Sequence, residues 1–309
     1  MAFVKSGFLR EIKKNKVKYI MILPGLALFL VFSYVPMIGI IMAFQNFNPA
    51  RGLFNSPWVG LKHFISFFNS PDAFKIIRNT ILLNVYGIVF GFPFPIIFAL
   101  ALNELKSGGL KRVIQTISCL PNFLSNVIIV GIVVLFLSPE RGLLNMVLSA
   151  LGFEKIYFLI EPAYFRGIYT IVNIWRGFGW GAIIYLAAIV GIGPELYESA
   201  ILDGASRFQR IIYITLPSIK STIVISLILS LAGILGSNFE MVYLLYNPLT
   251  YEVSDVISTY VYRRGIAGAR GIPEYSFGAA VGLFNSVVGF ILVIISNRLS
   301  RKVLGTSIY

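Results

Sequence analysis

Residues 193–217 read GPELYESAILDGASRFQRIIYITLP and form a charged segment between two long apolar runs. Pro194 suits the first turn of a helix, because a nitrogen at that position needs no hydrogen-bond partner. Gly204 suits the left-handed conformation that ends a helix, and Ser206 suits the cap that starts the next one. The segment therefore predicts a helix, a turn and a second helix, with a membrane helix starting near Pro217. The alternative is an ordinary loop at a membrane interface, in which proline, glycine and serine are equally common.

The composition is that of an integral membrane protein. Of the 309 residues, 57% are hydrophobic and only 13% are charged, which is about half the charged fraction of an average soluble domain. The mean hydropathy is +0.82. The net charge of +13 does not indicate nucleic-acid binding, because the basic residues flank apolar runs instead of gathering on a soluble face.

Six apolar segments are each long enough to cross ~30 Å of hydrocarbon at about 1.5 Å per residue. The first is too long for the core of a signal peptide and lacks a clear small-residue cleavage site, so we expect it to stay in the protein as a transmembrane helix. The predicted fold class is all-α, with six transmembrane helices in a single domain, residues 1–309. The predicted spans lie near residues 19–44, 79–103, 115–138, 166–190, 218–246 and 275–297.

Six spans place both termini on the same side of the membrane. More of the 26 Lys and Arg residues lie on that side than on the longer loops of the opposite side. The basic residues on the side of the termini lie in the N-terminus (1–18), the loops 104–114 and 191–220, and the C-terminus. Because basic residues favour the cytoplasmic side, we expect both termini and the 193–217 segment to be cytoplasmic. The protein is then a multi-pass protein of the cytoplasmic membrane.

Motifs for nucleotide binding and hydrolysis are missing from the sequence. There is no G-x-x-x-x-G-K-[ST] phosphate loop, no H-E-x-x-H and no G-x-S-x-G. The single cysteine and single histidine do not make up the ligand set of a zinc site. We therefore expect no catalytic residue, metal or cofactor in this chain; any ATP and Mg²⁺ that it uses would be bound by another subunit.

Polar residues inside apolar spans are costly and mark candidate sites. Arg176 lies ten residues into the fourth span, and Asn173 and Trp180 fall on the same helical face. We expect this face to line a translocation path, with Arg176 binding hydroxyls or a carboxylate. The alternative is a structural arginine that pairs with a backbone carbonyl or a partner subunit. The predicted path residues are Asn173, Arg176, Trp180, Asn238, Glu240 and Asn285.

Other polar groups carry weaker expectations. Glu240 is the sole acid within a span, so we expect it to pair or to face water. Asn122 and Asn126 in the third span are expected to hydrogen-bond to neighbouring helices. In the outer loop, residues 255–265 mix aromatic rings with cations. That mixture is typical both of sugar contacts and of an aromatic belt at the membrane interface.

The cytoplasmic segment resembles a known family signature. Membrane subunits of ABC importers carry E-A-A, three residues, G, nine residues and I-x-L-P in the loop that contacts the ATPase. Here Glu198-Ser199-Ala200, Gly204 and Ile214-x-Leu216-Pro217 keep this spacing throughout. Ser199 replaces the middle alanine, and Asp203-Gly204-Ala205 matches a common D-G-A variant. The resemblance implies an ATPase-coupling set of Glu198, Ser199, Ala200, Asp203, Gly204, Ala205, Ile214, Leu216 and Pro217.

The whole chain is similar to the polysaccharide and oligosaccharide branch of the carbohydrate-uptake ABC permeases. The stretches that carry this likeness are residues 23–44, 119–132, 254–265 and 275–289. The resemblance implies the type I importer fold with cytoplasmic coupling helices, in a bacterial cell membrane. It also implies several partners: a second similar permease in a heterodimer, two ATPase subunits that hold ATP and Mg²⁺, and an extracellular solute-binding protein.

The substrate implied by the resemblance is an oligosaccharide. An acidic one from pectin or alginate is suggested by Arg176 and by three outer arginines, Arg263, Arg264 and Arg270, although the outer three would equally suit docking of the binding protein. Three alternatives stay open: a permease for another small solute, a six-span channel and a membrane scaffold.

Overall fold

The computed structural model describes residues 14–105, 108–233, 235–236, 238–268 and 271–304. These residues form helices and turns, and within them the sole β-type pairing is an isolated bridge between Gln45 and Trp58. The prediction of an all-α protein is therefore confirmed for the described part of the chain. Contacts divide the chain into two compact units, residues 1–67 with 264–283, and residues 68–263 with 284–309.

The first unit contains the first predicted span. α2 (Lys16–Phe29), η1 (Leu30–Tyr34) and η2 (Val35–Phe44) follow one another in a single helix that is long and apolar enough to cross a membrane. None of the residues of α2 is buried. A helix that is apolar all round fits lipid or another membrane subunit on every side. Two helices, α3 (Lys62–Phe68) and α17 (Tyr275–Leu304), contribute residues to both units.

Three more predicted spans are confirmed as long apolar helices. The second combines α4 (Ala73–Tyr86), η3 (Gly87–Gly91) and α5 (Pro93–Glu104). The fourth is α9 (Pro162–Val190), and the sixth is the apolar part of α17.

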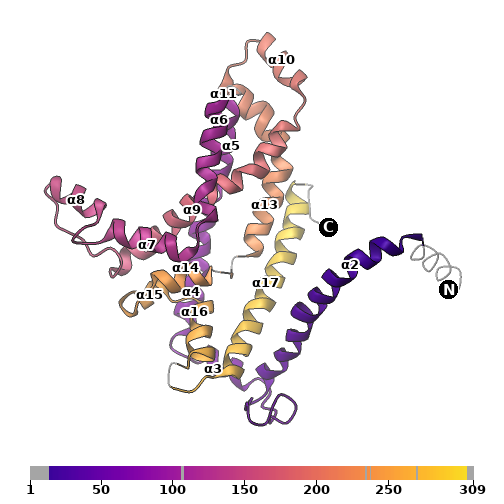
Figure 1. Cartoon of the computed structure of the whole chain (residues 1–309), viewed down its shortest axis with the longest axis vertical. Coiled ribbons are helices and arrows are strands. Elements are labelled where there is room, and N and C mark those ends of the chain that lie inside the picture. The colour runs from indigo at the N-terminus through magenta and orange to yellow at the C-terminus, as the bar shows by residue number, and fades with distance from the viewer. Residues whose placement is uncertain (1–13, 106–107, 234, 237, 269–270, 305–309) are drawn as a thin grey trace. The chain divides into compact units, whose positions relative to one another are not determined.

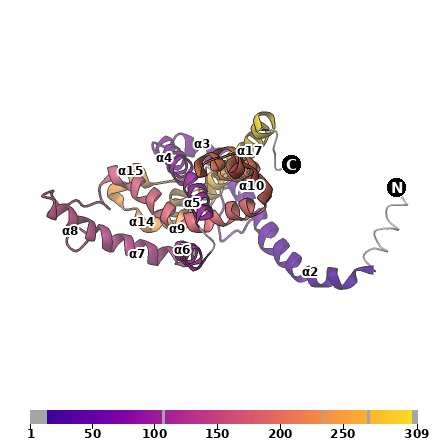
Figure 2. The ribbon, with the colours of Figure 1, turned by 90° about the horizontal axis from the view of Figure 1, so that it is seen from above.

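The third predicted span, residues 115–138, is wrong as a single helix. α6 (Gly109–Cys119) and η4 (Leu120–Phe123) end at Leu124, and α7 (Asn126–Leu137) then runs at 101° to them. Figure 2 shows α7 leading sideways from α6 toward α8 (Leu143–Ala150). The cause is local, because Ser125 is extended and caps α7 by accepting a hydrogen bond from the amide of Ile128.

The fifth predicted span, residues 218–246, is also interrupted. α13 (Lys220–Ala232) ends at Gly233, and the short helix α14 (Phe239–Leu245) starts after a new cap. That cap is Asn238, whose Oδ1 accepts from the amide of Met241 at 3.3 Å. A second bend, of 63°, separates α13 from the helical turns before it.

The helix α9 organises the second unit. It packs along α5 (Figure 1) and contributes to two apolar clusters. Gly179 permits the crossing with α6, because a Cβ at this position would lie only 2.1 Å from the carbonyl oxygen of Ser118. One cluster joins α9 to α4, α7 and α14 through Leu83, Ile129, Val130, Phe165, Tyr169, Val172, Met241, Val242 and Leu245. The other joins it to α5 and the start of α13 through Ala99, Ala182, Tyr185, Ile189 and Ile219.

Candidate functional site

The segment 193–217 forms the predicted helix, turn and helix. α10 (Pro194–Leu202) starts at Pro194, and α11 (Arg207–Arg210) follows a turn in which Gly204 has φ = +76°. The amide of Ala205 donates to the carbonyl of Ala200 at 2.8 Å, and the amide of Gly204 donates to that of Ile201 at 3.0 Å. These two bonds define a Schellman motif, in which the residue after the cap must be left-handed. The motif explains why the signature places a glycine four residues after an alanine.

The second helix of the loop is capped as predicted. Ser206 Oγ accepts from the amide of Gln209 at 3.3 Å, and Gln209 Oε1 accepts from the amide of Ser206 at 2.7 Å. This reciprocal capping box satisfies two amide groups at the start of α11. The role of Gln209 was not predicted, although a Ser followed three residues later by Gln is its usual sequence signal.

Within the second unit, α10 projects past the ends of α5 and α6 (Figure 1). None of the residues of α10 is buried, and Glu198, Ser199 and Asp203 are exposed. Large apolar side chains are exposed as well: Leu202 is 88% exposed and Phe208 is 71% exposed. Apolar side chains in contact with water on a charged loop are typical of a surface that a partner covers.

A hollow of about 460 Å³ lies between helices of the membrane region, and a second one of about 320 Å³ lies within the loop itself. The loop hollow is lined by Ala200, Asp203, Gly204, Ala205, Gln209, Arg210, Tyr213 and Ile214. Five of the predicted coupling residues thus surround one concave surface. The hydroxyl of Tyr197 lies 2.9 Å from Oγ1 of the buried Thr215 and ties α10 to the helical segment η5 (Ile211–Thr215).

Of the other four predicted coupling residues, Glu198 and Ser199 lie on α10, and Leu216 and Pro217 lie at the base of the loop. Leu216 and Pro217 belong to the short helix α12 (Leu216–Ser218), directly before the 63° bend into α13. Pro217 therefore marks the approach to the fifth membrane helix, and the long helix starts three residues later, at Lys220.

Of the three residues predicted to share one face of the fourth span, only Asn173 lines one of the two hollows. Asn173 lines the hollow of about 460 Å³, where its Nδ2 donates to the carbonyl of Tyr169 at 2.7 Å. Trp180 packs edge-on against Phe123 with 5.6 Å between ring centroids. Arg176 lines neither hollow, and its buried Nε has no hydrogen-bond partner among the described residues. A buried donor without a partner is costly in a membrane span, so Arg176 remains a candidate site residue.

Hydroxyl and amide groups surround the hollow of about 460 Å³. Its polar lining comes from Asn84, Thr170, Asn173, Tyr185, Ser226 and Ser230, and its aromatic lining includes Phe92 and Phe178. Aromatic faces beside hydrogen-bonding groups are the usual composition of a small-molecule site.

Glu240 pairs, as expected. Its Oε2 accepts a hydrogen bond from Nδ2 of Asn126 at 2.5 Å, so the third and fifth spans are joined where each is broken. The expectation that Asn126 bonds between helices is confirmed. Asn238 caps α14 two residues before Glu240. Asn285, the last predicted path residue, lies in α17 with a buried Oδ1 that has no partner among the described residues.

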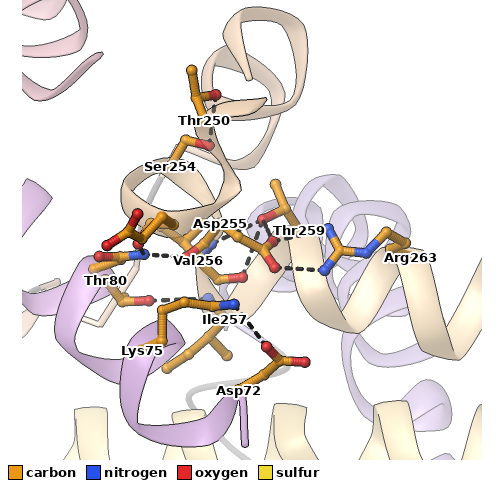
Figure 3. A network of polar contacts seen from close by, with 12 residues as sticks. Asp72, Lys75, Thr80, Thr250, Ser254, Asp255, Val256, Ile257, Thr259 and Arg263 are labelled. Carbon is orange, nitrogen blue, oxygen red and sulfur yellow. Dashed lines mark hydrogen bonds and ion pairs between the residues drawn. The ribbon is translucent and has the colours of Figure 1, made fainter. Parts of the chain in front are cut away.

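Two of the outer arginines are already paired. Arg263 forms a two-pronged ion pair with Asp255, a residue only 1% exposed, which also accepts from Thr259 (Figure 3). Arg264 pairs with Glu274 at 2.6 Å. Carboxylates of the chain itself thus already contact the charged groups of Arg263 and Arg264, which argues against the suggestion that these two arginines bind an acidic sugar. Arg270 lies outside the described residues.

The pKa of Arg263 is shifted by this pairing. Burial acts to lower the pKa, but the hydrogen bonds and charge of Asp255 outweigh burial and raise the pKa above the usual arginine value. A raised pKa on a cation means that the stabilising charge is present at every pH below it. The guanidinium of Arg263 therefore stays charged throughout the pH range in which proteins are folded.

The buried asparagine that anchors this outer segment was missed. Asn79 is fully buried and donates from Nδ2 to the carbonyls of Glu252 and Asp255, at 2.9 and 3.1 Å. Its Oδ1 accepts from Arg166 at 3.2 Å. An asparagine at the start of an apolar run is the only sequence signal of this role, and it does not identify the partners.

Among the described residues no group of three His, Cys, Asp or Glu side chains is arranged to hold a metal ion.

Residues 91–305 match the family model of the "binding-protein-dependent transport system inner membrane component". The chain is 44% identical over 298 residues to the polygalacturonan/rhamnogalacturonan transport system permease protein YteP of Bacillus subtilis (strain 168), covering 96% of this chain and 92% of that protein. It also resembles a chain in the crystal structure of a bacterial ABC transporter involved in the import of the acidic polysaccharide alginate. That likeness has a TM-score of 0.87 and 45% identity, over 96% of this chain and 99% of the other.

A second crystal structure shows a bacterial alginate ABC transporter in complex with an alginate pentasaccharide-bound periplasmic protein. A chain in it matches with a TM-score of 0.87 and 44% identity, over 97% of this chain and 99% of the other.

Proposed function

This chain belongs to the family of binding-protein-dependent transport system inner membrane components, and we propose that it is a permease subunit of an ATP-driven importer of acidic oligosaccharides. The observation that carries the proposal is the match over nearly the whole chain to permeases whose named substrates, polygalacturonan and alginate, are acidic polysaccharides. The same matches favour a permease over a channel or a scaffold.

The assembly follows from the family. We propose that residues 1–309 act as one type I permease domain beside a second, similar permease, with two ATPase subunits on the cytoplasmic side and a solute-binding protein outside. The alginate transporter captured with its periplasmic protein supports the last of these partners. ATP and Mg²⁺ would be held by the ATPase subunits, which leaves transport as the role of this chain.

The coupling loop supplies the mechanical link in this proposal. Glu198, Ser199 and Asp203 would meet the ATPase, and the hollow beside Ala200 and Gly204 would receive part of it. Closure of the ATPase dimer on ATP would move α10, and the base of the loop around Ile214, Leu216 and Pro217 would pass this motion to the fifth span. Packed helices then rock as rigid bodies, which opens the path outward. This mechanism requires both termini and the loop to be cytoplasmic, in agreement with the distribution of basic residues.

The substrate path would follow the polar residues of the fourth, fifth and sixth spans. Asn173 and Trp180 would contact sugar rings, and Arg176 would pair with a uronate carboxylate. Asn238, Glu240 and Asn285 would add hydrogen bonds along the path.

The proposal is tested by transport into vesicles that hold the full complex. Wild-type complex is expected to take up oligogalacturonates. Arg176→Ala should lower this uptake about tenfold or more, the effect of losing one charge-assisted hydrogen bond. Uptake of a neutral oligosaccharide, where the complex carries one, should change little.

Arg176→Lys is the matched control, because it keeps the charge and loses the planar fork of donors. Partial recovery in the lysine variant would support a carboxylate contact. Normal oligogalacturonate uptake by Arg176→Ala would return this arginine to a structural role.

A further inference from the structure

Five aromatic rings at and after the break in the fifth span lie in contact with one another. Phe239, Tyr243 and Tyr246 follow one another along α14 and its end, with ring centroids 5.4 and 5.5 Å apart. Tyr251 lies 4.9 Å from Tyr246. Tyr262 lies 5.2 Å from both Phe239 and Tyr243. We refer to these five residues as the tyrosine row.

The side of α14 that carries Tyr243 is uncovered in this chain, because Tyr243 is 40% exposed and Glu240 is exposed. Glu240 and Tyr243 are three residues apart on one helix, so they share a face. Glu240 is exposed, and its carboxylate, which accepts from Asn126, favours polar surroundings over hydrocarbon. The opposite face of α14, with Met241, Val242 and Leu245, is buried in the apolar core. An aromatic belt that contacts lipid does not account for a ring beside an exposed carboxylate.

The outer part of the row is held rigidly. Residues 250–263 are pinned to α4 by hydrogen bonds from the amide of Ile257 to Oγ1 of Thr80 at 3.0 Å and from Asn79 to the carbonyl of Asp255. Figure 3 shows Thr80 and Ile257 together with the pair of Asp255 and Arg263. The guanidinium of Arg263 lies 4.5 Å from the centre of the Tyr251 ring. Rings that are fixed before a ligand arrives lose little freedom on binding it.

We propose that the tyrosine row is an oligosaccharide-binding track that receives the sugar chain on the outer side of the path. A pyranose ring would lie against the ring of Tyr243, which is 40% exposed, and its hydroxyls would donate to the carboxylate of Glu240. The cation next to the row is neutralised by Asp255, so the track binds the uncharged faces of the sugar. The track would thus bind the sugar rings, whereas Arg176 would bind a uronate carboxylate. This inference rests on the proposed function.

The test compares two substitutions at one ring. Tyr243→Leu removes the aromatic face and keeps a large apolar side chain, whereas Tyr243→Phe keeps the face and removes the hydroxyl. In vesicles with the full complex, uptake of sub-saturating oligogalacturonates of two to five units should fall about fivefold in Tyr243→Leu. It should stay within about twofold of wild type in Tyr243→Phe, and the loss should grow with chain length as more sugar rings meet the row.

Phe74→Leu is the matched control, since Phe74 is a 77% exposed aromatic residue outside the row. The proposed track would be overturned if the Tyr243→Leu complex took up the sugars as fast as wild type. It would also be overturned if Phe74→Leu or Tyr243→Phe lowered uptake as much as Tyr243→Leu does. Loss of the second permease from purified Tyr243→Leu complex would overturn it as well, because the ring would then be a subunit contact. Failure of wild-type complex to take up the sugars would instead contradict the proposed function.

Discussion

Gly204→Val is expected to abolish sugar transport while leaving ATP hydrolysis by the assembled complex at or near its basal rate. Gly204 has φ = +76°, and no atom lies within 4 Å of the position that a Cβ would take. The valine would therefore fit sterically, and its cost is conformational, about 1–3 kcal/mol for a left-handed β-branched residue. Because no residue of α10 is buried, the surrounding structure has little to hold the strained turn in place.

Relief of that strain would break the two Schellman hydrogen bonds and let α10 swing as a loose segment. Transport should then fall more than tenfold, and sugar-loaded binding protein should no longer raise the rate of ATP hydrolysis. Gly204→Asn is the matched control, because asparagine adopts the left-handed conformation more readily than other side chains do. Equal coupling in the Val and Asn variants would show that this backbone conformation is not what the loop requires.

Asp255→Ala is expected to lower the free energy of unfolding of the outer segment by about 3 kcal/mol, the lower part of the range for breaking a buried ion pair. Asp255 is 1% exposed, and its loss leaves the guanidinium of Arg263, with a side chain 24% exposed, without its counter-charge. The hydroxyl of Thr259 loses the same acceptor. Hydrogen exchange over residues 250–263 in detergent-solubilised complex measures the effect.

The pair of Lys75 and Asp72, drawn in the same view (Figure 3), provides the comparison. It is a partly exposed pair between Lys75 in the first turn of α4 and the N-cap residue Asp72, with side chains 33% and 44% exposed. Asp72→Asn should therefore cost less than about 1 kcal/mol. If both substitutions increased exchange over residues 250–263 equally, the buried pair would not be the anchor that we describe.

The coupling loop was predictable because its structure is decided by short-range chemistry. Pro194, Gly204 and Ser206 each act through backbone conformation or a cap within a few residues, and the helix, the left-handed turn and the second helix all follow. What the sequence does not show is that the turn also makes a hollow with Gln209 and Tyr213. That hollow depends on how two helices approach, which local patterns do not specify.

The two broken spans were missed for a related reason. Hydropathy measures only how apolar a stretch is, and residues 115–138 and 218–246 are apolar from end to end. The breaks depend on Ser125 and Asn238, whose side chains accept hydrogen bonds from the helix that follows. Such residues are also frequent inside membrane helices, so their presence alone does not predict an interruption.

The outer arginines show the limit of reading charge from sequence. Arg263 looked available because its neighbours in the chain are aromatic, yet Asp255, eight residues earlier, is folded against it. Conversely, the interaction between Asn126 and Glu240 was predicted only as two separate tendencies. Their pairing across 114 residues is tertiary, and no local pattern identifies the partner.

The central claim is that this chain couples a sugar-loaded binding protein to an ATPase. The most direct test is the ATPase activity of the reconstituted complex with its binding protein, across a panel of acidic and neutral oligosaccharides. We predict stimulation by uronate-bearing oligosaccharides that requires the binding protein. Stimulation by neutral sugars alone would support the assignment as a sugar importer and contradict the acidic substrate. No stimulation by any sugar would contradict the assignment to carbohydrate import itself.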